Sequence, residues 1–245
     1  MAAPADLLDL KRLAALAQVR LQSRGAAEGS YAGPHASSYR GTGVEFADYR
    51  GYTEGDDIRL VDWKVFARTD RHVVKIYQSE RNLLSYLLMD TSASMGYAGT
   101  LTMTETKLRH ASRLAAALAY LAIQEGDEAG LYLGHQELTA SLPARAAWPQ
   151  LQAIAGQLDG AQAAGKTRLA ACLRTLFPRL KRRGILAIFS DFLDDLEDFW
   201  PAIDLYRQRH FEVMLFHLVH PEELALPAIP LARFEDPEMP GRVML

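Results

Sequence analysis

The sequence predicts an α/β protein whose main domain is a doubly wound, mostly parallel sheet flanked by helices. Two near-continuous apolar runs, 83–89 and 184–190, have the character of strands buried on both faces. Each run is followed at once by an aspartate, Asp90 or Asp191. Segments with apolar residues at helical spacing alternate with further strand-like runs. Strands that alternate with helices indicate a parallel sheet with right-handed crossovers.

The first part of the chain, 1–82, is predicted to be a smaller α+β arm packed on this domain. Residues 6–23 have leucines at helix-like spacing, and residues 25–43 are rich in Gly and Ser, which predicts a loop. Short strands are expected at 44–46 and 73–77.

The main domain, 83–220, has its remaining elements predicted in chain order. The helix at 104–125 has an apolar face at spacings of three and four, and Thr102-x-x-Glu105 has the pattern of a capping box. The other expected elements are strands at 129–133, 137–142 (a short edge strand) and 211–219, and helices at 146–157, 168–178 and 195–209. Residues 221–245 form a C-terminal tail that is expected to pack with the N-terminal region.

The composition excludes several classes of protein. The net charge of −3 and the pI of about 6.2 give no basic footprint for nucleic acid. The longest apolar run, 114–123, is shorter than the roughly 20 residues of a membrane span, so no direct membrane insertion is expected. The lack of a signal-peptide pattern and the single cysteine, Cys172, predict a cytoplasmic protein with that thiol buried.

The loop after the first apolar run carries the residues that indicate binding chemistry. It reads Asp90-Thr91-Ser92-Ala93-Ser94, and the alternation allows a tight turn to direct three oxygens inward. One carboxylate and two hydroxyls are hard donors that suit Mg²⁺ or Mn²⁺, and the tight loop favours these ions over the larger Ca²⁺. The alternative is a simple strand-end turn in which a serine caps the next helix.

This motif resembles the metal-ion-dependent adhesion site (MIDAS) of von Willebrand factor A domains. The resemblance implies a threonine from a later loop and an aspartate after a later strand, and Thr167 and Asp191 stand at those places. Asp90, Ser92, Ser94 and Thr167 would contact the ion directly or through water, with Asp191 behind them or acting through water. Lys166 stands where related sequences have a second glycine. In that family a partner's Asp or Glu completes the coordination of the ion.

The region 41–80 resembles the domain of unknown function 58 family, which joins such a segment to a von Willebrand factor A-like domain. The resemblance rests on the runs Gly41-Thr42-Gly43-Val44-Glu45-Phe46 and Gly55-Asp56-Asp57-Ile58-Arg59-Leu60-Val61-Asp62-Trp63-Lys64, and Phe234-Glu235-Asp236-Pro237-Glu238 also fits the family's tail. Members are often encoded beside MoxR-type AAA+ ATPases, so the resemblance implies such an ATPase, or its client, as the protein partner.

Charged and aromatic residues are dense in this region, and three interpretations of them stay open. They form a structural network of paired charges, a partner surface, or a second, nuclease-like metal site built from Asp56, Asp57, Asp62 and Lys64. The basic residues interleaved with the acidic ones favour pairing over metal capture. The residues concerned are Glu45, Asp48, Arg50, Asp56, Asp57, Arg59, Asp62, Trp63, Lys64 and Arg68.

Two functions follow from the candidate site. The first is a non-enzymatic, metal-dependent protein-interaction module that works with the ATPase in complex assembly or maturation. The alternative is a metal-dependent hydrolase, of phosphatase or nuclease type, acting at the strand ends. The sequence offers little for the alternative, because Ser92 replaces the second aspartate of a haloacid-dehalogenase-type motif and no Gly-x-Ser-x-Gly or Walker A motif is present.

Overall fold

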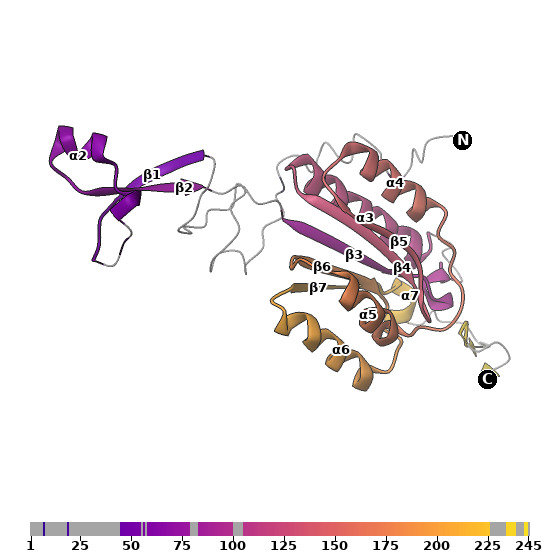
Figure 1. Cartoon of the computed structure of the whole chain (residues 1–245). Coiled ribbons are helices and arrows are strands. Elements are labelled where there is room, and N and C mark those ends of the chain that lie inside the picture. The colour runs from indigo at the N-terminus through magenta and orange to yellow at the C-terminus, as the bar shows by residue number, and fades with distance from the viewer. Residues whose placement is uncertain are drawn as a thin grey trace. The chain divides into compact units, whose positions relative to one another are not determined.

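The computed structural model of the chain describes residues 45–54, 56, 58–78, 83–99, 105–225, 234–238 and 243–244, together with Leu7 and Val19. The chain divides into two compact units, drawn in Figure 1. The larger unit contains residues 1–21 and 84–245, and the smaller unit contains residues 22–83. Apart from Leu7 and Val19, the predicted helix at 6–23 and the predicted loop at 25–43 lie outside the described residues.

The larger unit is built on a five-stranded sheet with the order β5-β4-β3-β6-β7. Its strands are β3 (Leu84–Asp90), β4 (Glu128–Gly134), β5 (Leu138–Arg145), β6 (Ile185–Ser190) and β7 (Glu212–His217). β3 pairs in parallel with β4 and β6, and β7 pairs in parallel with β6. Only β5, at the edge, runs antiparallel to its neighbour within this sheet. The predicted α/β class and mostly parallel sheet are therefore confirmed.

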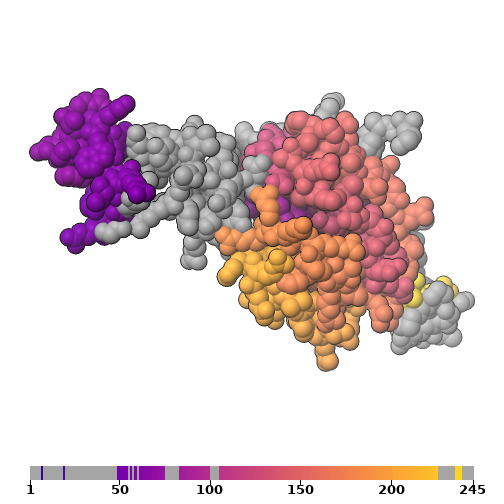
Figure 2. Space-filling model, in the orientation of Figure 1, coloured from indigo at the N-terminus to yellow at the C-terminus, as the bar shows by residue number. Residues whose placement is uncertain are grey.

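Helices cover both faces of this sheet. Successive residues of a strand point to opposite faces, so Leu87 and Met89 of β3 lie in one apolar core and Tyr86 and Leu88 in the other. The first core contains α3 (Lys107–Gln124) and α4 (Trp148–Asp159), and the second contains α5 (Leu169–Leu176) and α6 (Leu196–Gln208). The space-filling view shows surface from both layers, with α4 in salmon and α6 in orange (Figure 2).

Three elements of the larger unit differ from their predicted form. The predicted capping box is wrong, because α3 starts at Lys107 and its cap is Thr106, whose side chain accepts from the Arg109 amide; Thr102 lies outside the described residues. The edge strand β5 extends to Arg145, beyond the predicted 137–142. The predicted helix at 168–178 ends at residue 176 and continues as the 3-10 turn η4 (Phe177–Arg179), because proline at position 178 cannot continue the α-helix.

The smaller unit contains an antiparallel pair of strands and a short helix. β1 (Glu45–Gly51) pairs with β2 (Val73–Gln78). β2 agrees with the predicted 73–77 to within one residue, whereas β1 continues to Gly51, well beyond the predicted 44–46. Between them lie η2 (Ile58–Leu60) and α2 (Trp63–Thr69), and this helix was not predicted from the sequence. Asp62 caps α2 by accepting hydrogen bonds from the backbone N–H groups of Lys64 and Val65.

The chain after β7 forms α7 (Pro221–Leu224) and the short antiparallel pair of β8 (Phe234–Glu235) and β9 (Val243–Met244). Cys172, on α5, is fully buried, as the sequence predicted. In the part of the chain that the structure describes, none of the helices combines the length and the apolar character needed to cross a membrane.

Candidate functional site

The residues predicted to hold a cation lie at the carboxyl ends of the two central strands. Asp90 is the last residue of β3, and Asp191 directly follows β6. The chain leaves β3 toward β4 on one side and returns as β6 on the other, and open α/β sheets bind ligands at such a reversal of strand order. The following residues are all buried: Asp90, Ser92, Ser94, Thr167 and Asp191.

The loop after β3 turns its polar side chains inward. The Asp90 Oδ1 atom accepts a hydrogen bond of 2.8 Å from the Ser92 amide, which folds the chain back on the strand end. A 3-10 turn, η3 (Ala93–Gly96), follows. The hydroxyl oxygens of Ser92 and Ser94 are 3.0 Å apart as a result. The sequence-predicted turn that brings one carboxylate and two hydroxyls together is therefore present.

The loop that carries Thr167 lies directly beside this turn. The Ala164 amide donates to the Thr91 carbonyl, and the Ala93 amide donates to the Gly165 carbonyl, both at 2.9 Å. These two backbone bonds bring the two loops side by side, although they are about 70 residues apart in the sequence.

Gly165 makes this close approach possible. Its φ of 74° lies in the left-handed region, and a Cβ there would overlap the ring of His135. Lys166, the departure from the related sequences, does not have a positive φ. The left-handed conformation that the loop requires is therefore adopted by Gly165, and Lys166 at the next position has an ordinary backbone conformation.

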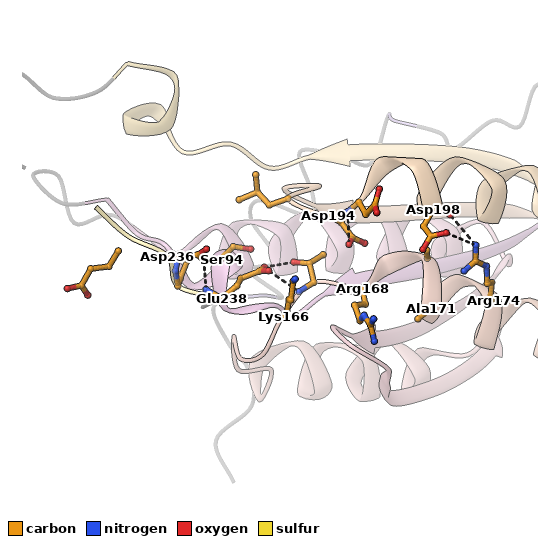
Figure 3. A pocket seen from close by; sticks show the side chains of 15 residues that line it. Ser94, Lys166, Arg168, Ala171, Arg174, Asp194, Asp198, Asp236 and Glu238 are labelled. Carbon is orange, nitrogen blue, oxygen red and sulfur yellow. Dashed lines mark hydrogen bonds and ion pairs between the residues drawn. The ribbon is translucent and has the colours of Figure 1, made fainter. Parts of the chain in front are cut away.

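Thr167 contacts a carboxylate from the C-terminal tail. Its hydroxyl donates to Glu238 Oε1 at 2.5 Å, and its amide donates to Glu238 Oε2 at 3.2 Å. Glu238 lines a cavity together with Ser94 and Lys166 (Figure 3). The cavity has a volume of about 920 Å³, and apart from Ser94 its lining residues fall within the segments 166–174, 193–198 and 235–238.

Asp191 is engaged by a buried lysine at the start of α3. Lys107 Nζ lies 2.8 Å from Asp191 Oδ2 and 2.7 Å from Glu223 Oε1. The side chains of Lys107 and Asp191 are 4% and 3% exposed, so this is an interior ion pair. Asp191 Oδ1 also accepts from the Leu193 amide at 3.3 Å. Asp191 thus has a cationic partner supplied by the protein.

Asp90 differs from Asp191 because, among the described residues, no basic side chain forms an ion pair with it. Its Oδ2 atom accepts a hydrogen bond of 2.5 Å from the Ser190 hydroxyl. Burial raises the pKa of the Asp90 carboxyl to about 6, and the nearby Asp191 adds to this, while hydrogen bonds from Ser190 and Ser92 oppose it. The ionised form of Asp90 is therefore destabilised until a cation approaches.

The donor set fits a small divalent ion. Each metal–oxygen bond of an octahedral Mg²⁺ is about 2.0–2.1 Å, so neighbouring ligand oxygens lie about 2.9 Å apart. The hydroxyl oxygens of Ser92 and Ser94 are 3.0 Å apart, which is close to that separation. In the described parts of the chain no group of three or more His, Cys, Asp or Glu side chains gathers. A site here would consist mainly of hydroxyls, which suits Mg²⁺ or Mn²⁺ better than zinc.

Three contacts of this site were missed from the sequence. Ser190 bonds Asp90, Lys107 bonds Asp191, and Glu238 bonds Thr167. Ser190 stands next to Asp191, so the strand-end argument that selected Asp191 could have included it. Lys107 is 84 residues from Asp191, and Glu238 is 71 residues from Thr167. Local sequence patterns do not predict contacts between residues so far apart.

The predicted charged network of the smaller unit is partly visible. Arg50 and Asp56 form two parallel hydrogen bonds of 2.7 and 2.8 Å, and the Thr53 amide and hydroxyl also donate to Asp56. The Tyr49 hydroxyl donates to Asp62, the cap of α2. The structural-network interpretation applies to these residues. Arg59, Trp63, Lys64 and Arg68 are exposed, whereas Asp57 and the side chains of Glu45 and Asp48 lie outside the described residues.

Asp56→Asn is expected to destabilise the smaller unit at neutral pH. Arg50 and the Thr53 groups hold the pKa of Asp56 well below its usual range, so the stabilisation is present above the ordinary carboxyl pKa of about 4 and is lost as the pH falls below it. Amide hydrogen exchange of β1 and β2 should accelerate in the variant at pH 7, and the difference from wild type should shrink toward pH 3.

Glu54→Gln is the matched control, because it removes the same charge from an exposed side chain two residues away. Equal exchange rates for the two variants would contradict a structural role for the Arg50–Asp56 pair.

One family model and several relatives match most of this chain. The family model described as "Protein of unknown function DUF58" matches residues 48–245. Uncharacterized proteins of Mycobacterium bovis and Mycobacterium tuberculosis are 30% identical over 237 residues, which cover 95% of this chain and 73% of each relative.

Solved structures with some similarity include two proteins of low identity. The conserved hypothetical protein BatB from Bacteroides thetaiotaomicron is 14% identical, with a TM-score of 0.45; the match covers 55% of this chain and 65% of that one, which is less than two thirds of its length. A von Willebrand factor type A protein from Catenulispora acidiphila is 15% identical, with a TM-score of 0.40, over 56% of this chain and 33% of that one.

Proposed function

This chain belongs to the DUF58 family of proteins of unknown function, and we propose that its von Willebrand factor A-like unit is a non-enzymatic, metal-dependent protein-interaction module. It would bind Mg²⁺ or Mn²⁺ at the strand ends and dock an Asp or Glu of a protein partner. The proposed partner is a MoxR-type AAA+ ATPase or its client in the cytoplasm, and the process is complex assembly or maturation.

The observation that carries this proposal is the buried hydroxyl pair of Ser92 and Ser94 beside the carboxylate of Asp90. Their oxygens are 3.0 Å apart, at the point where strand order reverses. These three side chains supply hard oxygen donors of the kind that Mg²⁺ or Mn²⁺ prefers, and a cation could be coordinated by all three at once. Asp90, Ser92, Ser94 and Thr167 would hold the ion, and when bound it would supply a positive charge for a partner's carboxylate.

The engagement of the two aspartates supports docking rather than chemistry. Asp90 accepts hydrogen bonds on both oxygens, from the Ser92 amide and the Ser190 hydroxyl, and these bonds hold the carboxylate at the strand end. Asp191 is paired with Lys107, which balances its charge. The protein residues thus orient donors and balance charge, and we assign them no role in bond cleavage.

Co-purification with a MoxR-type ATPase tests the proposal. Tagged full-length protein should retain the ATPase in excess Mg²⁺ and should lose it in EDTA. Ser94→Ala should also lose it, because it removes one donor that lines the cavity. Ser141→Ala is the matched control, since it deletes the same hydroxyl from an exposed position on β5.

The metal does not bridge the partners if the ATPase is retained in EDTA. The same conclusion follows if Ser94→Ala retains the ATPase as well as Ser141→Ala does. Metal-dependent turnover of a phosphate ester by the wild type would instead favour a hydrolase.

A further inference from the structure

The contact between Glu238 and Thr167 joins the chain's own tail to the candidate metal site. Both carboxylate oxygens of Glu238 are used, one on the Thr167 hydroxyl and one on its amide. With Glu238 in place, Thr167 is 1% exposed. Hydrogen bonds with an ionised acceptor are about twice as strong as neutral ones, which makes this a specific attachment of the tail.

The tail is shaped to make this contact. Asp236 accepts a hydrogen bond of 2.9 Å from the Glu238 amide, which closes a turn around Pro237. The preceding residues, Phe234 and Glu235, pair with β9. The turn and the strand pair together hold the segment that presents Glu238, so its carboxylate is directed by the backbone as well as by its own side chain.

The charges around the contact call for a further cation. Lys107 is shared by Asp191 and Glu223. Within the described residues, neither Asp90 nor Glu238 has a basic side chain in an ion pair. Among the described residues these two carboxylates therefore have no cationic partner, and one divalent ion would balance their charge.

We propose that Glu238 is the chain's own occupant of the carboxylate-docking position, so that a partner must displace the segment 234–238 in order to bind. This inference rests on the proposed function, because it takes the site beside Thr167 to be the one that docks a carboxylate. It also specifies the partner's chemistry: an acidic residue presented on a short turn, as Glu238 is presented after Asp236 and Pro237.

A peptide of the chain's own tail, residues 232–240, is the probe for this competition. The labelled peptide is added in trans to full-length wild type, Glu238→Gln and Glu235→Gln, each in Mg²⁺ and in EDTA, and binding is followed by fluorescence polarisation. Glu235→Gln is the matched control, since it removes one charge from the same segment. A tail that occupies its site nine tenths of the time weakens binding in trans about tenfold, so Glu238→Gln should bind the peptide at least about tenfold more tightly than the other two.

The Thr167 amide gives a second, independent readout. Because it donates to Glu238 in the intact chain, its hydrogen exchange should be faster in Glu238→Ala than in wild type or Glu235→Gln. The measurement needs neither a partner nor a metal.

The outcomes separate this inference from the proposed function. If Glu238→Gln binds the peptide more tightly in Mg²⁺ but not in EDTA, the result supports both the inference and the proposed function. The same difference in EDTA supports the inference and contradicts the metal dependence. Equal binding by the three proteins, or no binding by any, together with unchanged exchange at Thr167, overturns the inference and leaves the metal test with Ser94→Ala to decide the function.

Discussion

Replacing Lys107 by methionine is expected to destabilise the larger unit by about 3–5 kcal/mol. The variant keeps the apolar stem of the side chain and removes the ammonium, so Asp191, whose side chain is 3% exposed, loses the cation that lies 2.8 Å away. An unpaired buried charge accounts for most of the cost, because the interior does not solvate it. Urea-induced unfolding followed by circular dichroism measures the change.

Two controls make this expectation specific. Lys107→Met/Asp191→Asn removes both charges and should recover most of the lost stability. Arg182→Met breaks an ion pair with Glu128 that is partly exposed on both sides, and it should cost under about 1 kcal/mol. A Lys107→Met protein as stable as Arg182→Met would mean that Asp191 is satisfied without the lysine.

Asp90→Asn is expected to abolish binding of Mg²⁺ and Mn²⁺. Asparagine keeps the shape of the side chain but removes the charge that would attract the ion, and even outer-shell changes cost metal sites about 10–100-fold in affinity. Isothermal titration calorimetry of the wild type and the variant at pH 7.5 measures the loss. Asp204→Asn, an exposed position on α6, should bind as the wild type does. Undiminished binding by Asp90→Asn would remove the metal site from this loop.

When no metal is present, Asp90→Asn is expected to increase the stability of the folded protein. The pKa of Asp90 is raised to about 6, whereas an unfolded aspartate titrates near 3.9. Between these values the folded protein keeps a proton that the unfolded chain has lost, so the free energy of unfolding falls as the pH rises from about 4 to about 6. Asparagine does not ionise, so the free energy of unfolding of the variant does not decrease over this pH range. In EDTA at pH 7 the variant should therefore be more stable than wild type by on the order of 2 kcal/mol.

The parts of the site that follow from local pattern were predictable, and the parts made by distant segments were not. Asp90 and Asp191 were predicted because each ends a buried apolar strand, and strand ends meet at one edge of a parallel sheet. Thr167 needed the family resemblance, since nothing near it marks a ligand. The pairing of Lys107 with Asp191 depends on where α3 begins relative to β6, which is settled only by packing.

The smaller unit shows a different reason for a missed element. α2 has only seven residues, too few for an apolar period to stand out among charges. Its cap was nevertheless visible, because Asp62 precedes Trp63 and aspartate is a preferred cap. By contrast, β5 alternates half-buried and exposed residues along its length, a period of two that fits the edge strand predicted there.

Cys172 is the single thiol of the chain, and it is buried on α5. Burial raises its pKa to about 12, so the reactive thiolate is scarce at neutral pH. Maleimide reagents should therefore leave the folded natural sequence unmodified. In Glu235→Cys, the new thiol at this exposed position would take a fluorophore selectively, and departure of the tail from the cavity could be followed in real time with no other residue changed.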